Sequence, residues 1–107
     1  MLIYGPDSAV AEAGPLWTLA GFVEGADAWI ARDDPDGDLR FVVLDWIIGR
    51  CEDPYRGVRR EAGFPNLWYG VVPYSQRGTT AVMCSYWIVE SEHLVRCESV
   101  ATIGLPI

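Results

Sequence analysis

The chain has 107 residues, half of them hydrophobic, and a formal net charge of −7. This length suits one domain with its own core, and the apolar content excludes a largely disordered chain. The acidic balance disfavours nucleic acids and anionic membranes as partners, no apolar run could span a bilayer, and the first residues lack the features of a secretory signal. We therefore expect a single domain over residues 1–107, located in the cytoplasm.

The three cysteines, Cys51, Cys84 and Cys97, do not follow the paired spacing of zinc sites. An odd number of cysteines without a secretory signal indicates free thiols in a reducing compartment. The sequence also lacks the motifs of phosphate-binding loops, dinucleotide-binding turns and metalloprotease helices. We therefore expect no metal and no other cofactor, and the sequence favours a binding protein over an enzyme without deciding between them.

The charges are unevenly distributed along the chain. Residues 1–53 hold eleven acids and three arginines, for a net charge of −8, whereas residues 54–107 hold four acids and five arginines, for a net charge of +1. There is no lysine, so every basic side chain is a planar guanidinium that can bind carboxylates or stack on rings. The acidic N-terminal half would attract a basic partner.

In chain order, a short edge strand can form at residues 1–4 and a short helix at residues 7–12, and three expected strands follow. Residues 16–23 can alternate their side chains as a strand, and residues 28–33 are a second strand candidate. Residues 34–37, with the sequence Asp-Pro-Asp-Gly, predict a tight turn, because proline presets φ and glycine tolerates a positive φ. Residues 39–48 are dense in β-branched and aromatic side chains. We therefore expect a third strand there, paired with the second in a hairpin.

The second half of the sequence predicts one helix and three further strands. Asp53 followed by Pro54 is typical of a helix start, and Gly63 of a helix end, so we expect a helix over residues 54–62. The expected strands lie at residues 66–74, 79–90 and 93–103. The fold class that follows is α+β, built mainly of antiparallel hairpins in a meander with one helix.

Aromatic residues stand next to one another in two of these strands, as Trp68-Tyr69 and Tyr86-Trp87. Neighbouring side chains of a strand point to opposite faces, so both faces of the sheet carry rings. One short helix cannot cover both faces, which leaves closure of the sheet, a homodimer, or a partner protein on an aromatic surface. The alternative is that the rings fill a small β core.

The acidic stretch of residues 33–38 resembles a calcium-binding loop only superficially. Placing Gly37 at the sixth position of an EF-hand loop puts Arg32 at the first position and Val43 at the twelfth, and neither residue can supply the required carboxylate. The stretch is then either a solvated hairpin tip or, with Glu24 and Asp27, a negative patch for a basic partner.

Several other residues offer chemistry, each with a structural alternative. Arg56, Arg59 and Arg60 could bind a phosphate or carboxylate, or could line a solvated helix face. Asp45 interrupts an apolar stretch and could act as an acid or base, or pair with an arginine. His93 is the only histidine and could pair with a cysteine nucleophile, although Cys84 and Cys97 have apolar neighbours that favour inert thiols.

The function that these features favour is a small acidic inhibitor that binds and masks a basic protein. A toxin-neutralising immunity protein and a phage-encoded anti-defence inhibitor both fit, and the target would be a toxin domain or a nucleic-acid-binding protein, with no direct contact to nucleic acid or membrane. The expected partner-binding residues are Glu24, Asp27, Asp33, Asp34, Asp36, Asp38, Trp68, Tyr69, Tyr86 and Trp87.

The alternative function is a small β-rich enzyme or ligand-binding domain with an aromatic-lined pocket. Asp45, Tyr69, Tyr86 or His93 would then supply the polar groups of that pocket. A nucleic-acid binder that uses the arginines of residues 50–60 is a third interpretation, which the net charge of −7 opposes.

Overall fold

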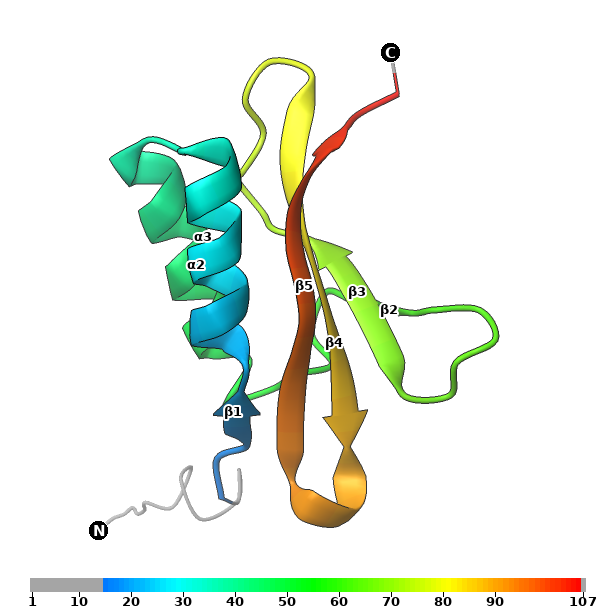
Figure 1. Ribbon diagram of the computed structural model, residues 1–107. Coiled ribbons are helices and arrows are strands. Elements are labelled where there is room, and N and C mark those ends of the chain that lie inside the picture. Colours follow the sequence, from blue (N-terminus) through cyan, green and yellow to red (C-terminus); the bar gives the residue numbers. More distant parts are fainter. Residues whose placement is uncertain (1–14, 107) are drawn as a thin grey trace, which may run out of the picture.

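The computed structural model describes residues 15–106, which form a helical layer packed on one face of a twisted sheet (Figure 1). The strand expected at residues 1–4 and the helix expected at residues 7–12 lie outside the described residues. The elements in chain order are β1 (Thr18–Ala20), α2 (Phe22–Asp33), α3 (Gly37–Gly49), β2 (Arg59–Arg60), β3 (Leu67–Val71), β4 (Thr80–Val89), a 3-10 turn (Glu90–Glu92) and β5 (Leu94–Gly104). The five strands have the order β1-β5-β4-β3-β2. Strand β1 runs parallel to β5 and the other neighbours are antiparallel, so the expected α+β class with a mostly antiparallel sheet is confirmed.

The strands expected in the C-terminal half are confirmed. Strands β3, β4 and β5 occupy most of the ranges 66–74, 79–90 and 93–103, and β4 and β5 form the long central hairpin. The register shifts between Ser85 and Tyr86, where β5 carries one extra residue. Such a bulge increases the local twist of the two strands.

The three strands expected at 16–23, 28–33 and 39–48 are wrong, apart from the three residues of β1. In α2 the buried residues Phe22, Ala26 and Trp29 are spaced by four and three positions, which is the helical period. The turn expected at residues 34–37 instead joins the two helices, and the Asp36 carboxylate caps α3 by accepting from the Leu39 amide at 2.8 Å.

Helix α3 looked like a strand because apolar residues lie on all of its sides. Leu39, Val43 and Ile47 are buried at four-residue spacing, but Phe41 and Ile48 are also apolar and remain 70% and 64% exposed. The outward apolar residues remove the polar stripe by which an amphipathic helix is recognised in a sequence.

The helix expected at 54–62 is also wrong, because this stretch forms turns followed by the short edge strand β2. The buried guanidinium of Arg50 holds the turns in place, donating from Nε to the Trp46 carbonyl at 3.2 Å and from Nη1 to the Arg56 carbonyl at 2.7 Å. The Tyr86 hydroxyl donates to the Pro54 carbonyl at 2.5 Å. These tertiary contacts with backbone carbonyls outweigh the local helix-start signal at Asp53-Pro54.

The core lies between the helices and the face of the sheet that they cover. The side chains that fill it come mainly from α2, α3 and the helix-facing positions of β4 and β5. They are Phe22, Trp29, Leu39, Val43, Ile47, Val72, Val82, Cys84, Tyr86, Ile88, Val95 and Val100. The opposite face of the sheet has no helix over it (Figure 1). Among the described residues, no helix combines the length and the hydropathy needed to cross a membrane.

Candidate functional site

Four aromatic rings and a carboxylate meet at one end of the sheet, and we call this group the sheet-end site: Trp17, Tyr55, Trp68, Glu90 and His93. Trp17 stacks on His93 with ring centroids 3.9 Å apart and planes 19° from parallel. Tyr55 meets Trp68 edge-on at 5.1 Å and Trp17 edge-on at 6.2 Å. The rings come from the segment before β1, the loop after α3, strand β3 and the turn that precedes β5, so the fold gathers them from four separate parts of the chain.

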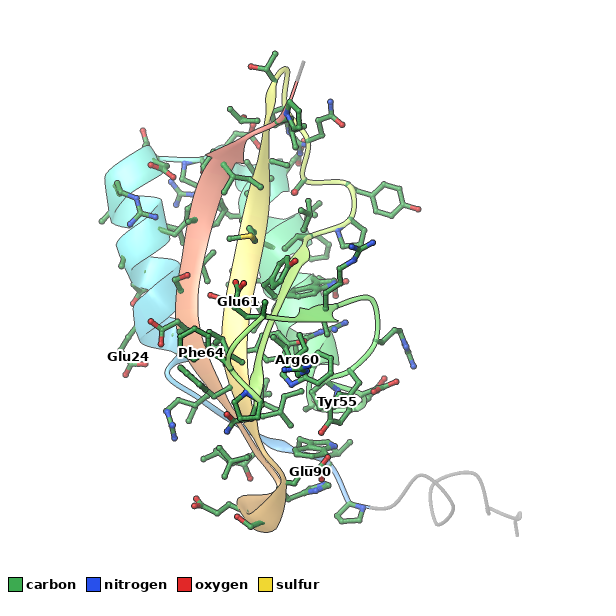
Figure 2. All side chains as sticks on the ribbon, turned by 90° about the vertical axis from the view of Figure 1, so that its right-hand side faces the viewer. Glu24, Tyr55, Arg60, Glu61, Phe64 and Glu90 are labelled. Atoms are coloured by element: carbon green, nitrogen blue, oxygen red, sulfur yellow. The ribbon has the colours of Figure 1, made fainter. Side chains whose placement is uncertain are left out.

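Tyr55 and Glu90 form the polar centre of the sheet-end site. The Tyr55 hydroxyl donates a hydrogen bond to Oε2 of Glu90, and Figure 2 shows the two side chains converging at the lower end of the sheet. Burial, the hydrogen bond and the negative charge of Glu90 together raise the pKa of Tyr55 to about 12. Tyr55 therefore stays protonated at neutral pH and is the hydrogen-bond donor of the pair.

His93 is held in one tautomer and in an uncommon backbone conformation. Its Nε2 lies 2.9 Å from the Pro15 carbonyl oxygen, which can only accept, so the proton of the neutral ring lies on Nε2 and Nδ1 remains an acceptor. The residue has a φ of 52°, and its amide donates to the Glu90 carbonyl at 3.1 Å. Non-glycine residues with positive φ are uncommon, and strained ones concentrate at functional sites.

The sheet-end site thus combines a carboxylate, a phenol and an imidazole with partly exposed ring faces. Such a surface can bind a planar or cationic group by stacking and can exchange protons with it. Arg60 borders the site, because its register partner in β3 is Trp68. The described residues contain no group of three or more histidine, cysteine or acidic side chains arranged to hold a metal ion.

The uncovered face of the sheet carries a second set of side chains, and Figure 2 views the molecule from this side. Tyr69 lies in register between Arg59 and Ser85, and the Ser85 and Ser99 hydroxyls are hydrogen-bonded at 2.9 Å. Trp87 lies on the same face, where its Nε1 donates to Glu98 at 2.9 Å. This face is polar and aromatic.

Two of the aromatic residues expected to bind a partner lie on this uncovered face, and two do not. Tyr69 and Trp87 lie on the uncovered face, while their sequence neighbours Trp68 and Tyr86 point to the opposite face, as the alternation in a strand requires. Trp68 belongs to the sheet-end site. Tyr86 is fully buried in the core, so the expectation that it contacts a partner is wrong.

The expected acidic residues all lie in the helical layer. Glu24 and Asp27 are exposed on α2. The other four surround the α2–α3 connection, where Asp33 accepts from the Thr102 hydroxyl, Asp34 pairs with Arg40, Asp36 caps α3 and Asp38 lies in its first turn. The cluster is therefore not a hairpin tip, and at least three of its carboxylates stabilise the helical layer. Residues 22–49 contain seven acids and two arginines, a net charge of −5.

An apolar groove lies between α2, α3 and β1. It encloses about 390 Å³ and is lined by Leu19 and by apolar side chains of both helices, with Glu24 at its rim. Val23 and Ile48 line it and remain 72% and 64% exposed. Asp45, considered above as an acid or base, is exposed on α3 next to the groove residue Leu44.

The sequence analysis missed most of the sheet-end site. Trp17, Tyr55 and Glu90 were not among the candidates, and His93 was considered only as a partner for cysteine or as a polar group of an aromatic-lined pocket. No local motif connects these residues, because they lie up to 76 positions apart in the sequence, from Trp17 to His93. The pairing of β1 with β5, of β5 with β4 and of β4 with β3, and the contacts that hold the loop after α3, bring them together.

No family model matches the sequence, and no curated protein matches it. Among solved structures, the chain is similar in fold to an arginine double mutant of the E. coli toxin RelE in the free state. The two share 14% sequence identity and a TM-score of 0.55, over 84% of this chain and 83% of the other. At this identity the similarity concerns the fold alone.

This similarity corrects the function expected from the sequence. The fold is similar to that of the toxin RelE, and this similarity contradicts the expected assignment as an inhibitor, either an immunity protein or an anti-defence protein. The acidic composition that led to that assignment reflects the caps and ion pairs of the α2–α3 connection as well as an exposed surface.

Proposed function

We propose that this chain is a toxin-like cytoplasmic protein that arrests growth by binding a target protein through the sheet-end site. The observation that carries the proposal is the architecture it shares with the toxin RelE over most of its length. The sheet-end site supplies what a protein contact needs, because tryptophan, tyrosine and arginine dominate the binding energy of protein interfaces. The free thiols of Cys51, Cys84 and Cys97 are consistent with the reducing environment of the cytoplasm.

A protein is the favoured class of target because of the distribution of charge. The helical layer carries −5, and residues 50–107 contain six acids and six arginines, so neither part offers a net positive surface to phosphates. Ring stacking and hydrogen bonds do not need such a surface. Salt-sensitive binding of the purified chain to RNA, or cleavage of RNA by it, would contradict this choice of target.

Inducible expression in E. coli tests the proposal. The chain should arrest growth, and Tyr55→Phe and Glu90→Gln should each relieve the arrest, because they remove the polar centre of the site while keeping its shape. Tyr74→Phe is the matched control, since Tyr74 is 89% exposed and lies outside the site. This control should remain as toxic as the parent.

Circular dichroism and melting temperatures must first show that all four proteins fold alike. Normal growth with a folded, well-expressed parent chain would overturn the toxin proposal. Full toxicity of both site variants would instead exclude the sheet-end site as the active surface.

We further propose that the apolar groove binds a basic, amphipathic segment of a partner protein. The groove is lined by Val23, Leu44 and Ile48, and the layer around it carries a net charge of −5. Apolar side chains of such a segment would fill the groove while lysines or arginines meet Glu24, Asp27 and Asp45. The same negative charge opposes a second copy of this chain as the occupant.

A labelled helical peptide with leucines on one face and lysines on the other is the probe for this groove. The peptide should bind, and Ile48→Ser should weaken its binding, whereas Phe41→Ser, at an exposed position of α3 that does not line the groove, should not. Equal binding by both variants would contradict the proposal. A dimer in sedimentation that Ile48→Ser dissolves would show that a second copy is the occupant.

A further inference from the structure

Cys84 and Cys97 lie on the two central strands, with both side chains between the sheet and α2. Cys84 of β4 pairs in register with Val100, and Cys97 of β5 pairs with Tyr86, on either side of the bulge. The two cysteines therefore occupy diagonal positions on the same face of neighbouring strands, close enough for each thiol to shift the pKa of the other. Both remain free thiols.

The two thiols differ in their access to solvent. Cys84 is fully buried in the core, whereas Cys97 is partly exposed. Cys97 lines an open surface pocket of about 480 Å³, together with Gly21 and Gly25 of the α2 start. A small solute can therefore reach Cys97 but not Cys84.

Gly25 leaves the space that the Cys97 sulfur occupies. A Cβ atom at position 25 would lie 2.7 Å from that sulfur, which is too close for any real contact. Gly25 has an ordinary helical backbone, so its φ does not require glycine. The position requires glycine because any side chain would clash with the sulfur. Glycine within a helix costs stability relative to alanine. The space for the Cys97 thiol thus lowers the stability of helix α2.

The two sulfurs also differ in acidity. Their interaction lowers the pKa of Cys97 and, together with burial, raises the pKa of Cys84, while burial, Glu98 and Glu24 act against the lowering at Cys97. The accessible sulfur is thus the one with the lowered pKa, and thiolates are the nucleophiles of cysteine chemistry.

We propose that Cys97 and Cys84 form a dithiol site that reacts with hydroperoxides, Cys97 as the attacking thiol and Cys84 as the resolving thiol. The Cys97 sulfur attacks one oxygen of hydrogen peroxide, the O–O bond breaks, and a sulfenic acid forms with release of water. The Cys84 sulfur then attacks the Cys97 sulfur, the S–O bond breaks, and a second water leaves. Two thiols are oxidised to one disulfide and one peroxide is reduced to two waters.

Mass spectrometry of the intact reduced chain after brief treatment with hydrogen peroxide tests this site. The chain should lose the mass of two hydrogen atoms, and peptide mapping should find the disulfide between Cys84 and Cys97. Cys51 is the internal control, because it is also partly exposed but lies far from both in the sequence. The variant Cys51→Ser should form the same disulfide at the same rate.

Two variants separate the roles of the thiols. Cys84→Ser should stop at a sulfenic acid on Cys97 that a dimedone probe captures, and Cys97→Ser should leave Cys84 unreacted. If either variant fails to fold, the disulfide found by mass spectrometry in the unmodified chain still tests the proposal. A disulfide that involves Cys51, oxidation beyond the sulfenic acid without any disulfide, or no reaction in the parent chain would each overturn the proposal.

Discussion

Tyr86 and Arg50 meet in the centre of the molecule, where Nη1 of Arg50 lies 3.5 Å from the Tyr86 hydroxyl. Both side chains are buried, and together they bind three backbone carbonyls of residues 46–56. The Arg50 guanidinium also stacks on the Trp46 ring at 4.0 Å. This pair anchors the loop that carries Tyr55, so it connects the core to the sheet-end site.

Replacing Tyr86 by phenylalanine should therefore destabilise the chain. The Pro54 carbonyl would lose its buried donor, at a cost of about 1–3 kcal/mol in the free energy of unfolding. Urea denaturation measures this loss. Tyr74→Phe, at an exposed position, should change the unfolding free energy by less than about 0.5 kcal/mol. Equal effects of the two changes would show that the buried hydrogen bond contributes nothing.

Asp36→Ala should also lower stability, because it removes the carboxylate that caps α3. The loss of a cap of this kind typically costs about 0.5–2 kcal/mol. Asp38→Ala is the matched control, since Asp38 lies in the first turn of the same helix and favours it only through its charge, worth about 0.3–1 kcal/mol. Thermal unfolding in high salt should reduce the effect of Asp38→Ala more than that of Asp36→Ala. The reverse order would contradict the capping role.

The Tyr55–Glu90 pair predicts a loss of stability at alkaline pH. The pKa of Tyr55 is raised from 10.0 to about 12 in the folded chain, so the folded state binds its proton more tightly than the unfolded state does. This contribution is fully present below pH 10 and is lost as the pH rises toward 12. Denaturant midpoints measured across this range should fall with increasing pH.

Absorbance of the tyrosinate form measures the same ionisation directly in the folded chain. Glu90→Gln should move the Tyr55 titration back toward its ordinary value, because it removes the negative charge that opposes ionisation. Glu92→Gln, in the same 3-10 turn but without the hydrogen bond to Tyr55, serves as the control. A Tyr55 titration near 10 in the unaltered chain would refute the pairing.

Local sequence patterns were sufficient to predict strands β4 and β5. Alternation over ten or more residues with β-branched and aromatic side chains is a strong local signal, and the opposite directions of Trp68 and Tyr69 follow from it without any tertiary information. The α+β class and the mostly antiparallel sheet follow from the same patterns. By contrast, the apolar residues on every side of α3 made a helix look like a strand.

Only the tertiary structure showed which reactive and aromatic side chains come together in a site. The turns after α3 depend on Arg50 and Tyr86, which bind backbone carbonyls from inside the core, and no local pattern encodes that long-range contact. The sheet-end site needs the parallel pairing of β1 with β5 to bring Trp17 onto His93. The sequence by itself determined the acidic charge, the free thiols and the central hairpin, because these depend on composition or on neighbouring residues, whereas the sites depend on contacts between distant ones.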